Sequence, residues 1–137
     1  MLEGRCSKMQ FITKYRTINI ENINEMVIAF YTKILKEDNA VTKVFVGKLG
    51  DDINNELWQE HIEILTNFWA MIALDDDTYK GNPLQAHFDL PLDREMFSTW
   101  LKMFFELVDS KYEDKVGIVF KSRAENIAMN FIRNLNL

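Results

Sequence analysis

The sequence predicts a single all-α domain. Apolar side chains recur at three- and four-residue intervals along most of the chain, which is the period of an amphipathic helix. Only five glycines and two prolines occur among the 137 residues, so few chain reversals are encoded. A β-sandwich or barrel would need a turn roughly every 8–12 residues. The length is sufficient for one hydrophobic core.

The first long helix is expected over residues 20–37, where the apolar positions share one face. Asn19 can begin it, because an asparagine side chain accepts a backbone hydrogen bond from the first turn. A short apolar segment, residues 41–46, follows. Gly47 and Gly50 are expected to break the chain after this segment.

Three further long helices are expected, over residues 55–74, 93–110 and 113–135. The acidic run at residues 75–77 is expected to end the first of these, since like charges at a helix C-terminus oppose its dipole. Asp93 can cap the second. Pro83 and Pro91 bracket a short element of one or two helical turns.

Residues 1–17 lack the helical period and are expected to form a loosely attached lead-in to a single domain over residues 1–137. The lone cysteine, Cys6, permits no internal disulfide and is compatible with a reducing compartment. No signal-peptide-like run is present, and the longest apolar stretch has seven residues, whereas a membrane span needs about twenty. These features predict a cytoplasmic protein without a membrane partner.

The net charge of −5 disfavours nucleic acid as a partner, because phosphate binding depends on lysine and arginine. A glycine-rich phosphate loop, a cysteine pair for zinc and a Gly-x-Ser-x-Gly nucleophile motif are all missing from the sequence. The search for a functional site therefore falls on other residues.

The two histidines are the most informative of these residues. His87 lies between the two prolines, on a short and stiff element, and His61 lies on the apolar stripe of the helix over residues 55–74. A histidine on an apolar face is more often a hydrogen-bonded core residue than a ligand. Together with the aromatic residues of the other helices, however, the pair suits a flat apolar cofactor with an axial metal site, such as haem.

Tyr31 and Trp100 are the next candidates, because each places one polar group on the apolar face of its helix. A buried tyrosine hydroxyl or indole N–H needs a hydrogen-bond partner. The alternative is that both are ordinary core residues bonded to backbone or water, and the helical period alone favours this alternative.

At this point several segments resemble the group III truncated haemoglobins, which are small bacterial globins of two-over-two helical fold. The resemblance covers residues 17–137. It rests on Phe30-Tyr31, Phe45, Trp58-Gln59-Glu60-His61, Asn67-Phe68-Trp69, the segment from Tyr79 to Leu84, His87-Phe88-Asp89-Leu90-Pro91, Trp100-Leu101-Lys102 and Phe104. The segment with His87, combined with the upstream Asn-Phe-Trp, is the most specific part.

The resemblance implies a two-over-two helical sandwich around haem b, iron protoporphyrin IX. His87 would be the proximal iron ligand, and Tyr31 and Trp100 would donate hydrogen bonds to the iron-bound ligand. His61 would be a distal histidine that moves between closed and open positions. Haem-contacting roles are implied for Phe30, Phe45, Leu65, Phe68, Trp69, Leu84, Phe88 and Phe104. The candidates for the propionates, by position only, are Tyr79, Gln85 and Arg94.

The implied function is binding of O₂, NO and CO at the haem iron, with slow O₂ release because two distal groups donate hydrogen bonds. Slow release suits nitric oxide dioxygenation or peroxidase-like handling of peroxide, with electrons from a separate reductase. Two alternatives remain open: a gas-binding or sensing globin without turnover, and a haem-free helical interaction module. Coordination of iron by both His87 and His61 is a further variant.

Overall fold

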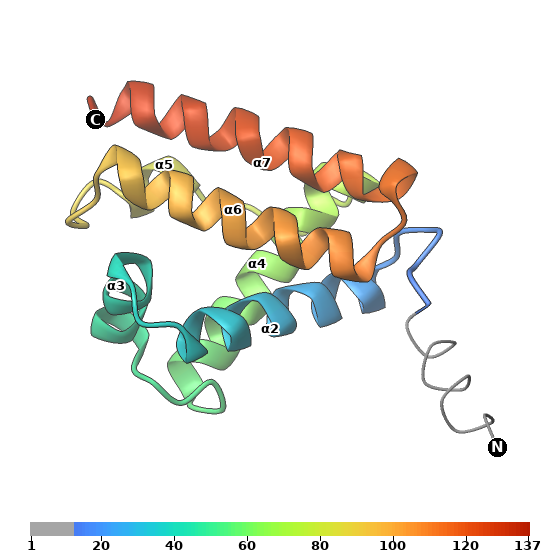
Figure 1. Cartoon of the computed structure of the whole chain (residues 1–137), viewed down its shortest axis with the longest axis horizontal. Coiled ribbons are helices and arrows are strands. Elements are labelled where there is room, and N and C mark those ends of the chain that lie inside the picture. Colours follow the sequence, from blue (N-terminus) through green and yellow to red (C-terminus); the bar gives the residue numbers. More distant parts are fainter. Residues whose placement is uncertain (1–12) are drawn as a thin grey trace, which may run out of the picture.

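Six helices make up the part of the chain that the computed structural model describes, residues 13–137, and no strand occurs among these residues (Figure 1). The all-α prediction is confirmed. The helices are α2 (Ile20–Lys36), α3 (Ala40–Leu49), α4 (Glu56–Leu74), α5 (Pro83–Ala86), α6 (Arg94–Lys111) and α7 (Asp114–Asn134).

Side-chain caps begin five of these helices. In each case the cap oxygen accepts a hydrogen bond from the backbone N–H three residues later, which satisfies a donor that the first turn leaves unpaired. The caps are Asn19, Asn39, Asn55, Asn82 and Asp93. The predicted caps at Asn19 and Asp93 are confirmed, and α7 begins at Glu113 without a side-chain cap.

The predicted break at Gly47 is wrong, because α3 continues through this residue to Leu49. A single glycine inside a helix costs about 1 kcal/mol relative to alanine, which is too little to end a helix that packs on its neighbours. The break occurs at Gly50 instead. Gly50 adopts a φ of 87°, a left-handed backbone conformation that glycine accepts without strain.

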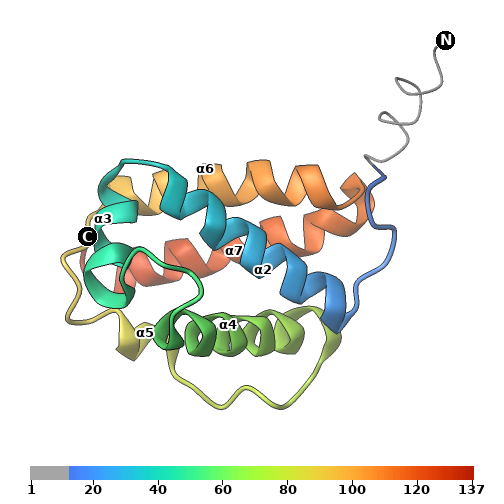
Figure 2. The ribbon, with the colours of Figure 1, turned by 90° about the horizontal axis from the view of Figure 1, so that it is seen from below.

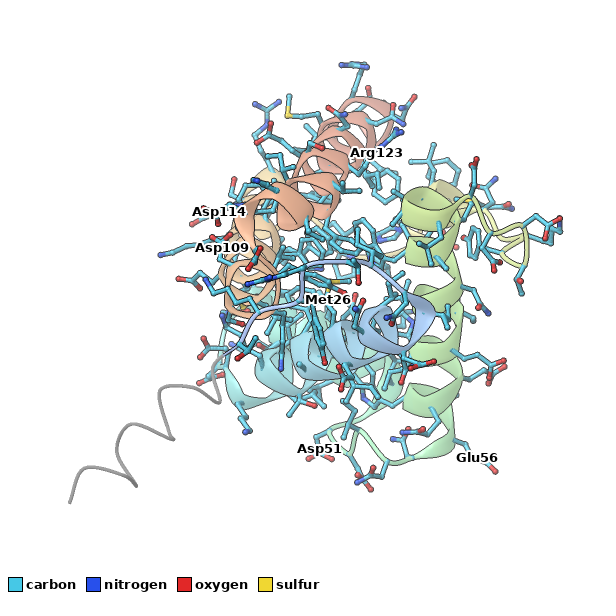
Figure 3. All side chains as sticks on the ribbon, turned by 90° about the vertical axis from the view of Figure 1, so that its right-hand side faces the viewer. Met26, Asp51, Glu56, Asp109, Asp114 and Arg123 are labelled. Carbon is cyan, nitrogen blue, oxygen red and sulfur yellow. The ribbon has the colours of Figure 1, made fainter. Side chains whose placement is uncertain are left out.

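The helices form two packed pairs, α2 with α4 and α6 with α7. Helix α2 also contacts α6 and lies between α6 and α4 in the view of Figure 2. Large side chains fill the space between the pairs, among them Met26, Trp58 and Phe104. Met26 lies at the centre of the molecule in Figure 3, whereas the labelled charged residues, such as Asp51 and Arg123, lie at its rim.

The described end of the predicted lead-in is attached to the turn between α6 and α7. The Tyr15 N–H donates to the Lys111 carbonyl at 2.9 Å, and the Glu113 N–H donates to the Tyr15 carbonyl at 3.0 Å. These bonds hold Tyr15 beside Tyr112. Residues 1–12 of the predicted lead-in lie outside the described residues. Within residues 13–137, no helix combines the length and the apolar character needed to cross a membrane.

Candidate functional site

A cavity of about 520 Å³ lies between the α3–α4 side of the molecule and the α5–α6–α7 side. Its walls are mostly apolar, and its volume falls in the range typical of small-molecule and cofactor sites. Eight predicted site residues line it: Tyr31, Phe45, His61, Leu65, Phe68, Trp69, His87 and Trp100. Four helices and the α5 segment thus bring together residues that are far apart in the sequence.

Four other predicted contact residues do not line the cavity. Phe30 packs behind the wall, with its ring centroid 5.0 Å from that of Tyr31, and Phe104 lies behind Trp100.

Leu84 packs in a separate small cluster with Phe97, Ala128 and Phe131. The Phe88 side chain is 57% exposed. The helical period identifies an inward face but does not separate a lining residue from one a layer behind it.

Several lining residues were not predicted as part of the site. They come from α3, from the stretch between α5 and α6, and from α6 and α7, and include Val41, Val44, Lys48, Leu49, Leu90, Phe97, Ile127 and Phe131. The sequence offered one signal for some of them: the apolar period places Phe97, Ile127 and Phe131 on the inward faces of their helices. Among the propionate candidates, Tyr79 and Gln85 line the cavity, whereas the Arg94 guanidinium donates to the Leu137 carbonyl at 3.4 Å.

The His87 imidazole has a defined tautomer. Its Nδ1 lies 2.6 Å from the carbonyl oxygen of Pro83, one turn earlier, and its ring centroid is 4.7 Å from that of Phe131. A carbonyl oxygen only accepts, so Nδ1 carries the hydrogen and donates it. In the neutral imidazole, the lone pair then lies on Nε2. This second-sphere bond is the one that orients a histidine toward a metal.

The His61 imidazole contributes an unpaired nitrogen. Nε2 of His61 is buried and has no hydrogen-bond partner among the described residues. Burial lowers the pKa of His61 to about 4, and a repulsive charge interaction with His87 adds to this effect. His61 is therefore neutral at pH 7. An unsatisfied buried polar group costs about 1–3 kcal/mol, so a group that binds beside it would recover part of this cost.

Tyr31 and Trp100 form a polar pair at the cavity wall. Burial raises the pKa of Tyr31, and a hydrogen bond with the Trp100 side chain lowers it by less, so the hydroxyl is protonated at neutral pH. An indole N–H only donates, whereas a protonated phenol both donates and accepts, so the pair brings two donor hydrogens to the cavity. The Tyr31 ring also contacts the rings of Phe45 and His61, at centroid distances of 5.1 and 5.4 Å.

Trp58, to which the sequence pattern assigns no polar role, packs against Tyr31 and His61 at the edge of the cavity. Its Nε1–H donates to the Gly50 carbonyl at 2.8 Å, which ties the start of α4 to the end of α3. The ring lies 5.5 Å from those of Tyr31 and His61, measured between centroids. Trp58 therefore holds the neighbours of the cavity in place without lining it.

Two helix pairs around an apolar cavity, with an imidazole on each of two facing sides, define the class of protein as a truncated globin. No protein-family model matches the chain. The chain is 37% identical over 119 residues to the group 3 truncated hemoglobin ctb of Campylobacter jejuni, a match that covers 86% of this chain and 91% of that protein. This chain belongs to the group 3 truncated haemoglobin family.

A solved structure agrees with this assignment. The crystal structure of the group III truncated hemoglobin from Campylobacter jejuni matches with a TM-score of 0.82 and 35% identity, over 90% of this chain and 95% of that chain. The prediction of a two-over-two globin fold is therefore confirmed.

The globin family implies a haem cofactor, and the residues of the cavity fit one. A porphyrin is largely apolar, as are the walls to which Phe45, Leu65, Phe68 and Trp69 contribute. An imidazole oriented through its Nδ1, as that of His87 is, offers the kind of nitrogen that haem iron takes on its proximal side. The fit thus rests on both the apolar lining of the cavity and the oriented imidazole of His87.

Proposed function

We propose that this protein binds haem b in the cavity, with His87 as the proximal ligand, and binds O₂ on the side of Tyr31, His61 and Trp100. NO and CO are further ligands of the same position. The observation that carries the proposal is the fixed tautomer of His87, which leaves the lone pair of the neutral imidazole on Nε2 in an apolar cavity. When bound, haem would supply an iron centre that takes a diatomic ligand.

Polar side chains at the cavity are available to the two carboxylates of haem. Lys48 offers an ammonium group, and Tyr79 and Gln85 offer neutral donors. Lys48 lies on α3 and Gln85 on α5, so these donors come from both sides of the cavity. Such an arrangement holds the polar edge of the cofactor while the aromatic residues contact its apolar part.

On the distal side, Tyr31 donates its hydroxyl hydrogen to the ligand. The Trp100 side chain also lines the cavity, and its indole N–H is the second donor to the ligand. The apolar lining of the cavity lowers the local dielectric constant, which strengthens such a hydrogen bond. His61 is neutral and adds no charge, so the hydrogen bonds from Tyr31 and Trp100 set the rate of release.

Slow release favours chemistry on the ligand over its transport. We propose nitric oxide dioxygenation or reaction with peroxide, with a separate reductase as electron donor. Sustained nitrate formation from NO and O₂ with an added reductant would support turnover. Nitrate limited to a single equivalent would instead indicate a gas-binding or sensing globin.

The distal assignment is tested by the O₂ dissociation rate of Tyr31→Phe, measured by stopped-flow replacement of O₂ with CO. Loss of one hydrogen bond of about 1–1.4 kcal/mol predicts roughly five- to tenfold faster release. Tyr112→Phe is the matched control, because it removes a buried hydroxyl that donates to Asn22 at 2.7 Å, outside the cavity. An unchanged rate in Tyr31→Phe would show that Tyr31 does not hold the ligand.

A further inference from the structure

A continuous series of aromatic rings leads from the cavity wall into the core. Trp100 and Trp69 both line the cavity. The ring of Phe104 lies between them and is stacked on both, with centroid distances of 5.1 Å and interplanar angles of 10° and 16°. The two indoles are therefore joined by direct ring contacts.

The series continues from Trp69 to the surface. Phe120 lies 5.8 Å from Trp69, Tyr112 lies 5.0 Å from Phe120, and Tyr15 lies 5.7 Å from Tyr112, measured between ring centroids. Phe120 and Tyr112 are fully buried, whereas 37% of Tyr15 is exposed. Each ring contacts the next, so no step of the route crosses solvent.

Tyr15 is the ring in this series whose hydroxyl has a basic partner. Its O–H donates to the carboxylate of Glu25 on α2. A phenol that loses an electron becomes a strong acid, so its oxidation is favoured where a base takes the proton. The buried Tyr112 hydroxyl donates instead to the amide oxygen of Asn22, which is a much weaker base than a carboxylate. When one ring of the series is oxidised, the missing electron is therefore expected to be supplied in the end by Tyr15, which becomes the tyrosyl radical.

We propose that Tyr15 is a surface oxidation site, connected to the cavity by the rings of Trp69, Phe120 and Tyr112, at which small phenols are oxidised. The proposal rests on the proposed function, because its oxidant is a peroxide that reacts at haem in the cavity. The exposed edge of Tyr15 gives the phenol access without entry into the cavity.

The electrons and protons of this reaction balance. Hydrogen peroxide takes two electrons and two solvent protons as its O–O bond breaks, and it leaves as two water molecules. Tyr15 supplies one electron through the rings, which replaces one of the two electrons that the peroxide took in the cavity. The Tyr15 proton passes to Glu25. A phenol in solution then gives one electron to Tyr15 and loses a proton to water, while Glu25 returns its proton. A second phenol supplies the second electron by the same steps.

The test mixes ferric haem-loaded protein with an equimolar amount of hydrogen peroxide and follows radicals by freeze-quench electron paramagnetic resonance. Mass spectrometry of spin-trap adducts identifies the residue. The expected result is a tyrosyl radical with the adduct on Tyr15, lost in Tyr15→Phe. Glu25→Gln should reduce the radical several-fold, because an amide does not take the proton. Glu21→Gln, in the first turn of the same helix, is the matched control and should leave it unchanged.

The route itself is tested with Phe120→Leu, which removes one ring and leaves Tyr15 and Glu25 in place. The Tyr15 radical should fall several-fold, whereas Phe105→Leu, whose ring lies outside the series, should not change it. Circular dichroism shows whether each variant is folded.

A Tyr15→Phe variant that keeps the signal with an adduct on another tyrosine, or a wild-type protein that forms no radical while its Soret band is intact, would overturn the proposal alone. Failure to take up haem, seen in the Soret band before peroxide is added, would overturn the proposed function together with it.

Discussion

At the residue scale, the two histidines differ because of their positions on the chain. Helix α5 has only four residues, so the Pro83 carbonyl is free to accept a hydrogen from the His87 ring one turn later. His61 lies in the middle of α4, where the backbone carbonyls are already used by the helix. One imidazole is thus oriented by the backbone, and the other keeps an unpaired nitrogen.

His61 is expected to make stability depend on pH. Its pKa is about 4 in the folded protein and near 6.5 when unfolded, so between these values the unfolded chain binds more protons. The stabilisation is present in full above pH 6.5 and is lost as the pH falls toward 4, by up to about 3 kcal/mol. Urea unfolding of protein prepared without cofactor, at pH 7, 5.5 and 4.5, measures this loss.

The matched variant is His61→Leu, which removes the titrating group. The loss of unfolding free energy between pH 7 and 4.5 should be clearly smaller in this variant than in the wild type. Equal losses in the two proteins would show that His61 is not held neutral in the fold.

Part of the site could be predicted from single residues. His87 between two prolines and Tyr31 on an apolar face were recognisable, and both line the cavity. Phe30 and Phe104 share that apolar period but lie behind the lining residues. A helix buries a stripe about 100° wide, and the sequence does not show which part of the stripe meets a cavity and which meets another side chain.

At the element scale, helix ends were the most predictable features, because a cap depends on a few neighbouring residues. The start of α2 and the proline-bracketed α5 follow directly from local sequence. The extent of α3 could not be predicted from local sequence, because its packing on α2 and α6 outweighs the weak helix propensity of Gly47. In proteins, tertiary packing contributes more to the stability of a helix than the helix propensity of its residues.

The two glycines of this region give opposite predictions. Gly50→Ala should lower the unfolding free energy by roughly 1–2 kcal/mol, because φ is 87° and the new Cβ would lie 3.0 Å from Nδ2 of Asn55. Gly47→Ala should raise it by roughly 0.5–1 kcal/mol, because the site is helical and the new Cβ would meet no packed neighbour within 4 Å beyond the adjoining helix backbone. Urea unfolding of the two variants measures both changes. Changes of the same sign would contradict the assigned end of α3.

At the scale of the whole molecule, the cavity arises where the two helix pairs meet. Helices α3 and α4 supply one side of it, and α5, α6 and α7 supply the other. The stretch between α4 and α5 contributes Tyr79 to the wall. No single segment encodes the cavity, so the sequence alone could not delimit it; the resemblance to a known family supplied the arrangement that local patterns lack.

The central claim is that the His87 imidazole is the proximal ligand of haem in this cavity. The most direct test is the visible absorption spectrum of the ferrous haem-loaded protein, compared with His87→Gly before and after imidazole is added. We expect the variant to lose the histidine-ligated spectrum and free imidazole to restore it by occupying the vacated volume. A wild-type spectrum in His87→Gly without imidazole would contradict the claim, because another residue would then hold the iron.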